Sequence, residues 1–269
     1  MDDFNFIRAA TLREAAEAFS KAGEGRYLAG GQTLLPVMKQ GLATPSDVIS
    51  LARVKELAGI TVESDKLAVA AMTRHADVAA HADVARLIPA LSVLAGGIGD
   101  PHVRNRGTIG GSLANNDPAA DYPAAVLGLN ATVLTDERAI TSDDFFQGLF
   151  TTALEPGELI TRVEFPVPQR SGYVKFPHPA SRYALVGVMV SQGAKGVRVA
   201  VTGAGACVFR VPKMEEALAK SFAPDAIDGI TITDGDLTSD RHGSAEYRAH
   251  LVNVLAKRAV ALALNGHRS

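Results

Sequence analysis

The stretch from Gly96 to Asp121, GGIGDPHVRNRGTIGGSLANNDPAAD, decides how this chain is organised. It is rich in Gly, Asn and Asp and is too long for an ordinary connection, and loops of this length in compact proteins are usually functional. Segments with the alternating pattern of strands lie before it, at 60–71, and after it, at 131–135. The sequence therefore predicts a functional, glycine-rich segment in the middle of an α+β chain.

A second glycine segment has the same form. Ala29 to Thr33 (AGGQT) and Thr108 to Ser112 (TIGGS) each place a Gly–Gly pair beside small hydroxyl or amide side chains, where a strand meets a turn or helix. Paired glycines allow positive φ and close approach, so successive N–H groups can point at one anion. One such pair alone is typical of a tight turn. Two pairs, with Asp117 and Asp121 behind the second to accept from ribose hydroxyls, favour a nucleotide diphosphate site.

Composition excludes several other classes of protein. The 269 residues are 47% hydrophobic and 21% charged with a net charge of −2, which excludes a disordered chain and gives no basic nucleic-acid surface. The single cysteine, Cys207, allows neither an intramolecular disulfide nor an iron–sulfur cluster held by this chain alone. The seven histidines lack metal-binding spacing, and we expect His75 and His81 on helix surfaces. No secretory leader and no apolar run of ~20 residues is visible, so we expect a soluble cytoplasmic protein.

Known catalytic and nucleotide motifs do not fit. GxSxG, HExxH and GxxxxGK[ST] are absent. Gly203-Ala204-Gly205 imitates the start of a dinucleotide fingerprint, but Val208 stands where Gly or Ala is expected. Neither glycine segment contains Lys or Arg, which favours a diphosphate held by backbone amides over a triphosphate clamped by a lysine.

Periodicity and turn signals predict the elements along the chain. Helices are expected at 11–22, 32–40, 74–80, 88–94, 212–220 and 244–264, and strands at 26–29, 47–51, 60–62, 67–71, 131–135, 159–165, 186–190 and 197–201. Prolines cluster at 166–180 and indicate a boundary there. We predict one domain at 1–170, with subdomains at about 1–55 and 56–170, and a second domain at 171–269.

The two glycine segments resemble the medium, FAD-binding subunit of the molybdenum hydroxylases, which include carbon monoxide dehydrogenase-like and xanthine dehydrogenase-like enzymes. The family pattern AGGxSLxPxMK corresponds to Ala29 to Lys39, and IGDxxVRNRGTIGGxLAxxDPxxD corresponds to Ile98 to Asp121 with almost no departure. Ser239-Asp240 and Gly243 to Arg248 resemble the family's last domain. The resemblance covers nearly the whole chain, and the second motif is highly specific.

The resemblance implies a fold and a cofactor. The implied fold is an α+β, FAD-binding domain of the vanillyl-alcohol-oxidase (PCMH) type with two α/β subdomains, followed by a C-terminal domain with a three-stranded sheet and a helix bundle. The implied cofactor is non-covalent FAD. The residues implied to bind it are Ala29, Gly30, Gly31, Gln32, Thr33, Leu34, Ile98, Thr108, Ile109, Gly110, Gly111, Ser112, Asn115, Asp117, Asp121, Ile160, Lys175 and His178.

Within that set the resemblance gives different roles. The two glycine segments would hold the diphosphate, Ile98 would approach the isoalloxazine, and Ile160 would contact the adenine side. Xanthine dehydrogenase-like members have a lysine before an Ala-Ser-Arg run, where this chain has His178-Pro179-Ala180-Ser181-Arg182 and a lysine three residues earlier. Whether Lys175 or His178 contacts FAD stays open.

The resemblance also implies the activity. The chain would be an electron-transfer subunit that takes electrons from a small [2Fe–2S] subunit and passes them to NAD, a quinone or oxygen, while a large molybdopterin subunit oxidises the substrate. The complex would be a dimer of heterotrimers, and this chain would carry no catalytic residues or metal ligands of its own. Two alternatives remain: a stand-alone flavoprotein oxidase, with His102 as the nearest residue for covalent attachment, and a cofactor-free scaffold subunit.

Overall fold

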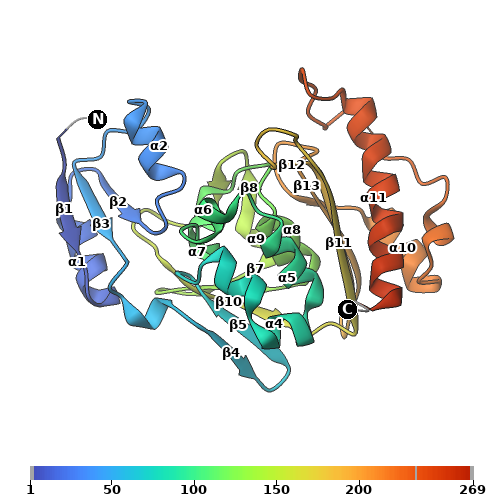
Figure 1. The fold of residues 1–269 in the computed structure, drawn as a ribbon, viewed down its shortest axis with the longest axis horizontal. Coiled ribbons are helices and arrows are strands. Elements are labelled where there is room, and N and C mark those ends of the chain that lie inside the picture. The colour runs from blue at the N-terminus through green and yellow to red at the C-terminus, as the bar shows by residue number, and fades with distance from the viewer. Residues whose placement is uncertain (1–2, 234, 267–269) are drawn as a thin grey trace.

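The chain has a mixed α+β fold with three larger β-sheets arranged in a row along its longest axis (Figure 1). The computed structural model describes residues 3–233 and 235–266, so the outermost residues of the two predicted domains lie outside the described residues. The two ends of the row are the N-terminal sheet with its helices and the C-terminal sheet with α11 against it (Figure 1). The glycine-rich segment lies in the centre.

The N-terminal unit is a small parallel sheet covered by helices. Its elements are β1 (Asn5–Arg8), α1 (Leu12–Lys21), β2 (Gly25–Leu28), α2 (Leu34–Lys39), β3 (Asp47–Ser50) and the 3-10 helix η1 (Lys55–Leu57). The strand order is β1-β3-β2, and both pairs are parallel because helices return the chain to the same end. Thr11 is the N-cap of α1, since its side chain accepts from the Glu14 amide.

The central unit is an antiparallel sheet with helices on one face. The sheet, in the order β4-β5-β10-β6-β7, contains β4 (Ile60–Glu63), β5 (Lys66–Ala70), β10 (Ile160–Pro166), β6 (Thr132–Thr135) and β7 (Ala139–Thr141). Its helices are α3 (His75–Ala80), α4 (Ala82–Leu87), α5 (Pro89–Gly96), α6 (Pro101–Arg104), α7 (Ile109–Asn115), α8 (Tyr122–Gly128) and α9 (Ser142–Phe145), and a ribbon of β8 (Phe146–Gly148) and β9 (Thr151–Thr152) follows them.

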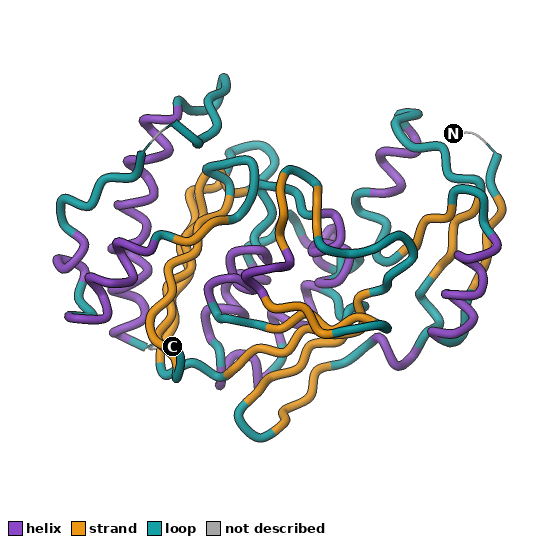
Figure 2. The backbone as a smooth tube through the Cα atoms, turned by 180° about the vertical axis from the view of Figure 1, so that it is seen from behind, coloured by secondary structure: helices purple, strands orange, loops and turns teal. Residues whose placement is uncertain are grey.

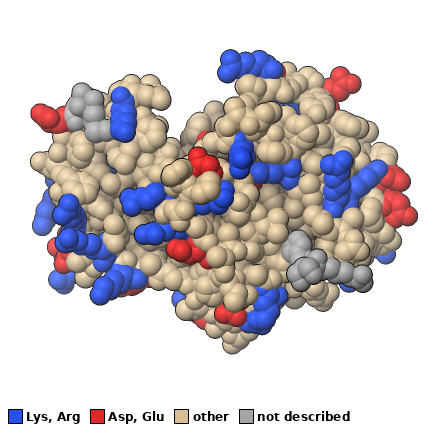
Figure 3. Space-filling view, in the orientation of Figure 1, with Lys and Arg blue, Asp and Glu red and all other residues tan. Residues whose placement is uncertain are grey.

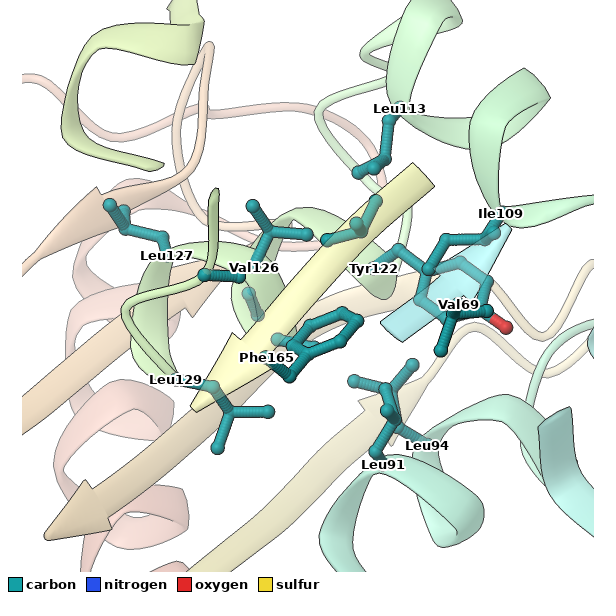
Figure 4. Close-up of a cluster of buried hydrophobic side chains, with 14 of the residues drawn as sticks. Val69, Leu91, Leu94, Ile109, Leu113, Tyr122, Val126, Leu127, Leu129 and Phe165 are labelled. Carbon is teal, nitrogen blue, oxygen red and sulfur yellow. The ribbon is translucent and has the colours of Figure 1, made fainter. Parts of the chain in front are cut away.

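The core of this unit fixes the helix that carries the second glycine pair. Ile109 and Leu113 of α7 point into the same apolar cluster as Tyr122 of α8, Leu94 of α5 and Phe165 of β10, all of which are fully buried (Figure 4). Burial of an aliphatic or aromatic side chain contributes about 1.5–3 kcal/mol. The position of α7 is therefore set by the core and does not depend on a ligand.

The C-terminal unit is an antiparallel sheet with helices against one face (Figure 2). The order is β11-β12-β13-β14, built from β11 (Arg170–Pro177), β12 (Ala184–Gly193), β13 (Gly196–Thr202) and β14 (Phe209–Arg210). The expected three-stranded sheet is corrected, because the two-residue β14 adds a fourth strand to three long ones. The helical part contains α10 (Pro212–Lys220), the 3-10 helix η2 (Pro224–Ile227) and α11 (Ala245–Asn265).

This C-terminal sheet holds the end of the glycine-rich segment in place. Within residues 118–120 every carbonyl is bound by it: the Gly203 amide donates to Pro118 O at 2.8 Å, the Ala184 amide to Ala119 O at 3.2 Å, and Thr202 Oγ1 to Ala120 O at 2.7 Å. The approach to Asp121 is therefore fixed by backbone contacts from β12 and from the end of β13.

Most predicted elements are confirmed to within a few residues, but several elements, among them β1, α4 and α8, were not predicted. The glycine-rich segment was expected to be a loop, but it contains the short helices α6 and α7. No strand was expected in the region of clustered prolines, but it contains the eight-residue strand β11, which pairs with β12 along its whole length.

Candidate cofactor site

The first glycine segment, between β2 and α2, presents a run of free backbone amides. Gly31 has φ +74, in the left-handed region that glycine adopts without strain. Within the described residues, the amides of Gly30, Gly31, Gln32, Thr33 and Leu34 donate to no protein acceptor, while Gln32 and Thr33 are exposed. Successive amides around a left-handed residue form a concavity that binds anions. This segment fits the predicted diphosphate role.

The second glycine segment differs, because the four amides of Ile109 to Ser112 are already used. The Ile109 amide donates to Thr73 O at 3.2 Å, the Gly110 amide to Ala71 O at 2.8 Å, and the Ser112 amide to Thr108 O at 3.0 Å. The Gly111 amide donates at 3.2 Å to Thr108 Oγ1, the N-cap of α7. The expectation of two equivalent amide cradles is therefore wrong: α7 begins here and docks on the end of β5.

The two glycine segments nevertheless meet. A Cβ on Gly30 would lie 2.7 Å from the carbonyl carbon of Arg106 and 2.8 Å from the Cα of Gly107. A Cβ on Gly111 would lie 3.5 Å from the Cβ of Ala29. The contact at Gly111 has an ordinary length, whereas a Cβ at Gly30 would overlap the backbone of a segment almost eighty residues away in the sequence. Glycine at 30 is therefore required for the two backbones to come together.

Both segments face one cavity of about 530 Å³. Ala29, Gly30 and Thr108 form part of its wall, and the rest comes from η1, the start of β4 and the segment before α3. Lys55, Arg74 and Arg106 also line it, and none of these three pairs with an acidic side chain among residues 3–233 and 235–266. The sequence analysis missed these cations because they lie outside the glycine pairs. On the face drawn in Figure 3, the surface is notched beside the lobe that carries α2, and Lys and Arg side chains gather below the notch.

Helix α7 joins this cavity to a second group of predicted residues. Seven residues at about 1.5 Å rise span roughly 10 Å. Beyond its end, Asp117 Oδ1 accepts from the Ala119 amide at 2.9 Å, and burial raises the pKa of this carboxyl. Asn115 is half-buried. Its neighbour Asn116, which was not predicted, is buried with φ +42 and donates through Nδ2 to Gly148 O and Thr151 O, so it anchors the β8–β9 ribbon.

Asp121 is the centre of this second group. Its side chain is 4% exposed, and Tyr173 Oη donates to Oδ1 at 2.5 Å while Lys175 Nζ donates to Oδ2 at 3.0 Å. Lys175 also donates to Gly97 O at 2.8 Å, next to the half-buried Ile98. The structure therefore brings Ile98, Asp121 and Lys175 together.

The two remaining predicted residues lie in different surroundings. His178 Nε2 is 3.1 Å from His242 Nδ1, and the amides of Ala180 and Ser181 donate to its Nδ1. Ile160 is 5% exposed at the start of β10, within the central core. Neither lines the cavity of the glycine segments.

Comparison with known proteins identifies the family. The model for the FAD binding domain in molybdopterin dehydrogenase matches residues 2–168. The chain belongs to this family of FAD-binding medium subunits. It is 36% identical to the nicotine 6-hydroxylase medium subunit of Paenarthrobacter nicotinovorans (93% of this chain, 94% of the relative) and 32% identical to the carbon monoxide dehydrogenase medium chain of Afipia carboxidovorans (96% and 95%).

Solved structures of this family match over the full length. Carbon monoxide dehydrogenase from Hydrogenophaga pseudoflava, in a form that lacks the Mo-pyranopterin moiety of its molybdenum cofactor, superposes with a TM-score of 0.89 at 30% identity, covering 98% of both chains. The mixed α+β fold of the medium subunit therefore extends through the C-terminal unit, beyond the matched FAD-binding domain.

One expectation about this family member's histidines is wrong. His75 was predicted on a helix surface, but it is 5% exposed, with its ring 5.3 Å from that of Tyr122. Burial, together with the nearby charge of Arg104, lowers its pKa to about 4. A Cβ on Gly107 would lie 2.5 Å from His75 Nε2, so glycine is needed there for the ring to fit. His81 is half-buried, caps α4 by accepting from the Asp83 amide, and lines the 530 Å³ cavity.

The described residues contain neither a group of metal-binding side chains nor a membrane-spanning helix. In that part of the medium subunit, no three His, Cys, Asp or Glu side chains are grouped so that they could hold a metal ion. Among the helices of residues 3–233 and 235–266, none combines the length and the apolar character needed to cross a membrane.

Proposed function

We propose that the chain binds FAD non-covalently and serves as the electron-transfer subunit of a molybdopterin-containing dehydrogenase or hydroxylase. The observation that carries the proposal is the meeting of two distant glycine segments at the wall of a cavity of about 530 Å³, which Ala29, Gly30 and Thr108 line. Five successive amides of the first segment, Gly30 to Leu34, donate to no acceptor among the described residues. Such amides match the charge and the multiple acceptor oxygens of a diphosphate. The residues present therefore fit the cofactor of the family.

Each part of the site has a proposed task. Ala29 to Leu34 would hold the diphosphate through backbone amides, and Thr108 to Ser112 would form the opposite wall. Asn115, Asp117 and Asp121 would support the cofactor along and beyond α7, with Ile98 toward the isoalloxazine, Ile160 toward the adenine and His178 near the flavin. When bound, the flavin supplies the capacity to take up electrons singly and release them as a pair.

The proposal includes the partners. Electrons would come from a small [2Fe–2S] subunit and go to NAD, a quinone or oxygen, and a large molybdopterin subunit would oxidise the substrate in a dimer of heterotrimers. Relatives of this chain are named as medium chains or subunits of enzymes for nicotine and for carbon monoxide. Similar medium subunits in enzymes for such different substrates support the view that another subunit selects the substrate.

The proposal also includes the domain division and the location. Residues 1–55 and 56–170 would be the two α/β subdomains of a vanillyl-alcohol-oxidase-like FAD domain, and 171–269 would be the C-terminal domain. A single cysteine in 269 residues fits the reducing cytoplasm.

The test is the flavin content of the full chain. We expect purified protein to contain FAD that acid precipitation releases into the supernatant. Gly111→Val should lose FAD, because its side chain would extend from a Cβ that is 3.1 Å from Thr108 Oγ1 and 3.5 Å from the Ala29 Cβ. Gly193→Val, where a Cβ meets nothing within 4 Å, is the matched control. Wild-type protein without flavin, or Gly111→Val with full flavin content, would contradict the proposal.

A further inference from the structure

The Lys175 side chain joins three segments of the chain at one point. It extends from β11, is 11% exposed, and donates to Gly97 O at 2.8 Å, to the Asp121 carboxylate at 3.0 Å and to Arg182 O at 2.9 Å. An ammonium group has three protons, and here each has an acceptor. Lys175 is therefore saturated by protein contacts and has no proton left to donate to a cofactor.

The three acceptors belong to the segments that carry predicted flavin contacts. Gly97 precedes Ile98, and Asp121 is itself one of the predicted residues. Arg182 lies in the turn after β11, where the His178 amide donates to Tyr183 O at 2.8 Å and the Arg182 amide donates to His178 O at 2.9 Å. A single ammonium group thus fixes the relative positions of three separate parts of the candidate site.

Tyr173, two residues earlier on β11, makes the second contact to Asp121. Its hydroxyl donates at 2.5 Å, the length typical of a hydroxyl bound to an ionised carboxylate. Space for this phenol depends on Gly187 of the neighbouring strand, since a Cβ there would lie 2.6 Å from Tyr173 Oη. The short bond and the adjacent ammonium both indicate that Asp121 is a carboxylate.

Lys175 is the charged group that stabilises the ionised form of Asp121. Burial raises the pKa of Asp121, and the charge of Lys175 together with the hydrogen bonds from Tyr173 and Lys175 opposes the rise. The other titratable groups nearby are Tyr122 on α8, Tyr183 in the turn and Asp117, and burial raises the pKa of each. His75, whose ring lies 5.3 Å from that of Tyr122, is neutral at pH 7 because its pKa is about 4. These groups add no positive charge, and the cation Arg104 on α6 donates to the carbonyls of Ile98 and Gly99 and not to Asp121. Loss of Lys175 would therefore leave a buried carboxylate without a paired cation.

Building on the proposed function, we propose that Lys175 and Tyr173 are positioning residues of the flavin site, which hold Asp121 as a carboxylate and fix the segments around Ile98 and His178. In the Asp121–Lys175 ion pair the two charges cancel, so the pair carries no net charge. Neither side chain needs to touch the cofactor.

The test measures the midpoint potential of FAD bound to the full chain between pH 6 and 9. In Lys175→Met the pKa of the Asp121 carboxyl should rise further, so a larger share of Asp121 is protonated at the low end of this range than at the high end. The potential should therefore stay near the wild-type value at low pH and shift below it as the pH rises, because a buried negative charge opposes reduction. Lys175→Met/Asp121→Asn should lose this extra inflection. Tyr173→Phe, which keeps the ion pair, should show a smaller displacement without an inflection.

Lys66→Met is the matched control, since it breaks a half-exposed ion pair with Glu164 on the central sheet. It should follow the wild type at every pH. A wild-type profile in Lys175→Met, or an inflection that persists in the double variant, would overturn the inference.

If Lys175→Met fails to fold, the double variant should still fold because it buries no unpaired charge. If both fail, a wild-type potential in Tyr173→Phe overturns the inference. Wild-type protein that binds no FAD would instead refute the proposed function.

Discussion

Replacing Gly30 with alanine should separate the two glycine segments. The added Cβ would lie 2.7 Å from the carbonyl carbon of Arg106 and 2.8 Å from the Cα of Gly107. Carbon atoms in contact lie about 3.5–4.0 Å apart, so the backbones must move apart by roughly 1 Å. Because both neighbours are backbone atoms, rotamer changes cannot relieve the clash, and we expect the upper end of the cost of overpacking, about 3 kcal/mol.

Thermal unfolding and FAD titration measure the effect. A loss of about 3 kcal/mol corresponds to a fall of roughly 6–12 °C in Tm for a protein of this size class. The displaced amides of Gly31 to Leu34 should lose at least one hydrogen bond to the diphosphate, which weakens FAD binding by about tenfold or more.

Gly193→Ala is the control for this substitution, because its Cβ meets nothing within 4 Å and its backbone is not left-handed. It should change the free energy of unfolding by less than about 0.5 kcal/mol. If Gly30→Ala has the same Tm and the same FAD affinity as Gly193→Ala, the close approach of the two segments is not required for either folding or binding.

Two further predictions concern buried charged or titratable side chains. The pKa of His75 is about 4 in the folded chain and near its ordinary 6.5 in the unfolded one, so the unfolded state binds more protons between these pH values. The free energy of unfolding should therefore fall by roughly 3 kcal/mol in total as the pH drops from 6.5 to 4. His75→Gln should flatten this part of the urea-unfolding profile, while His250→Gln, at an exposed position, should leave it unchanged. Arg248 is 3% exposed and donates to Leu185 O, Gly203 O and Asp240. Arg248→Ala should therefore lower the free energy of unfolding by about 3 kcal/mol, whereas Arg13→Ala, at an exposed i,i+4 pair, should lower it by less than about 0.5 kcal/mol. Equal losses in the two arginine variants would contradict the structural role of Arg248.

Local signals in the sequence were sufficient for much of the fold. Thr11 and Glu14 mark the start of α1, and the apolar stripe of 244–264 marks α11, because caps and helical periodicity act over a few residues. Strand β11 was missed, since Arg170–Pro177 lies among prolines that normally interrupt sheets. Its pairing with β12 is a tertiary effect that no short window contains.

In the candidate site, too, local motifs could be predicted from the sequence and long-range contacts could not. The glycine motifs located both segments, and the resemblance to the family named the cofactor. The use of the second segment's amides could not be predicted, because their acceptors, Ala71 and Thr73, come from a strand end far earlier in the chain. Likewise the partners of Lys175 lie 54 and 78 residues away. His75 was predicted on the surface because a polar residue is usually exposed. Its burial depends on the ring of Tyr122 and on the absence of a Cβ at Gly107, which the local sequence does not reveal.

The central claim is that free amides at Gly30 to Leu34 recognise the diphosphate of FAD. Competition binding to the FAD-free full chain tests it most directly. We predict that FAD binds one per chain, that ADP displaces it, and that riboflavin, which has no phosphate, binds far more weakly. Riboflavin binding as tightly as FAD, with ADP unable to compete, would contradict the claim.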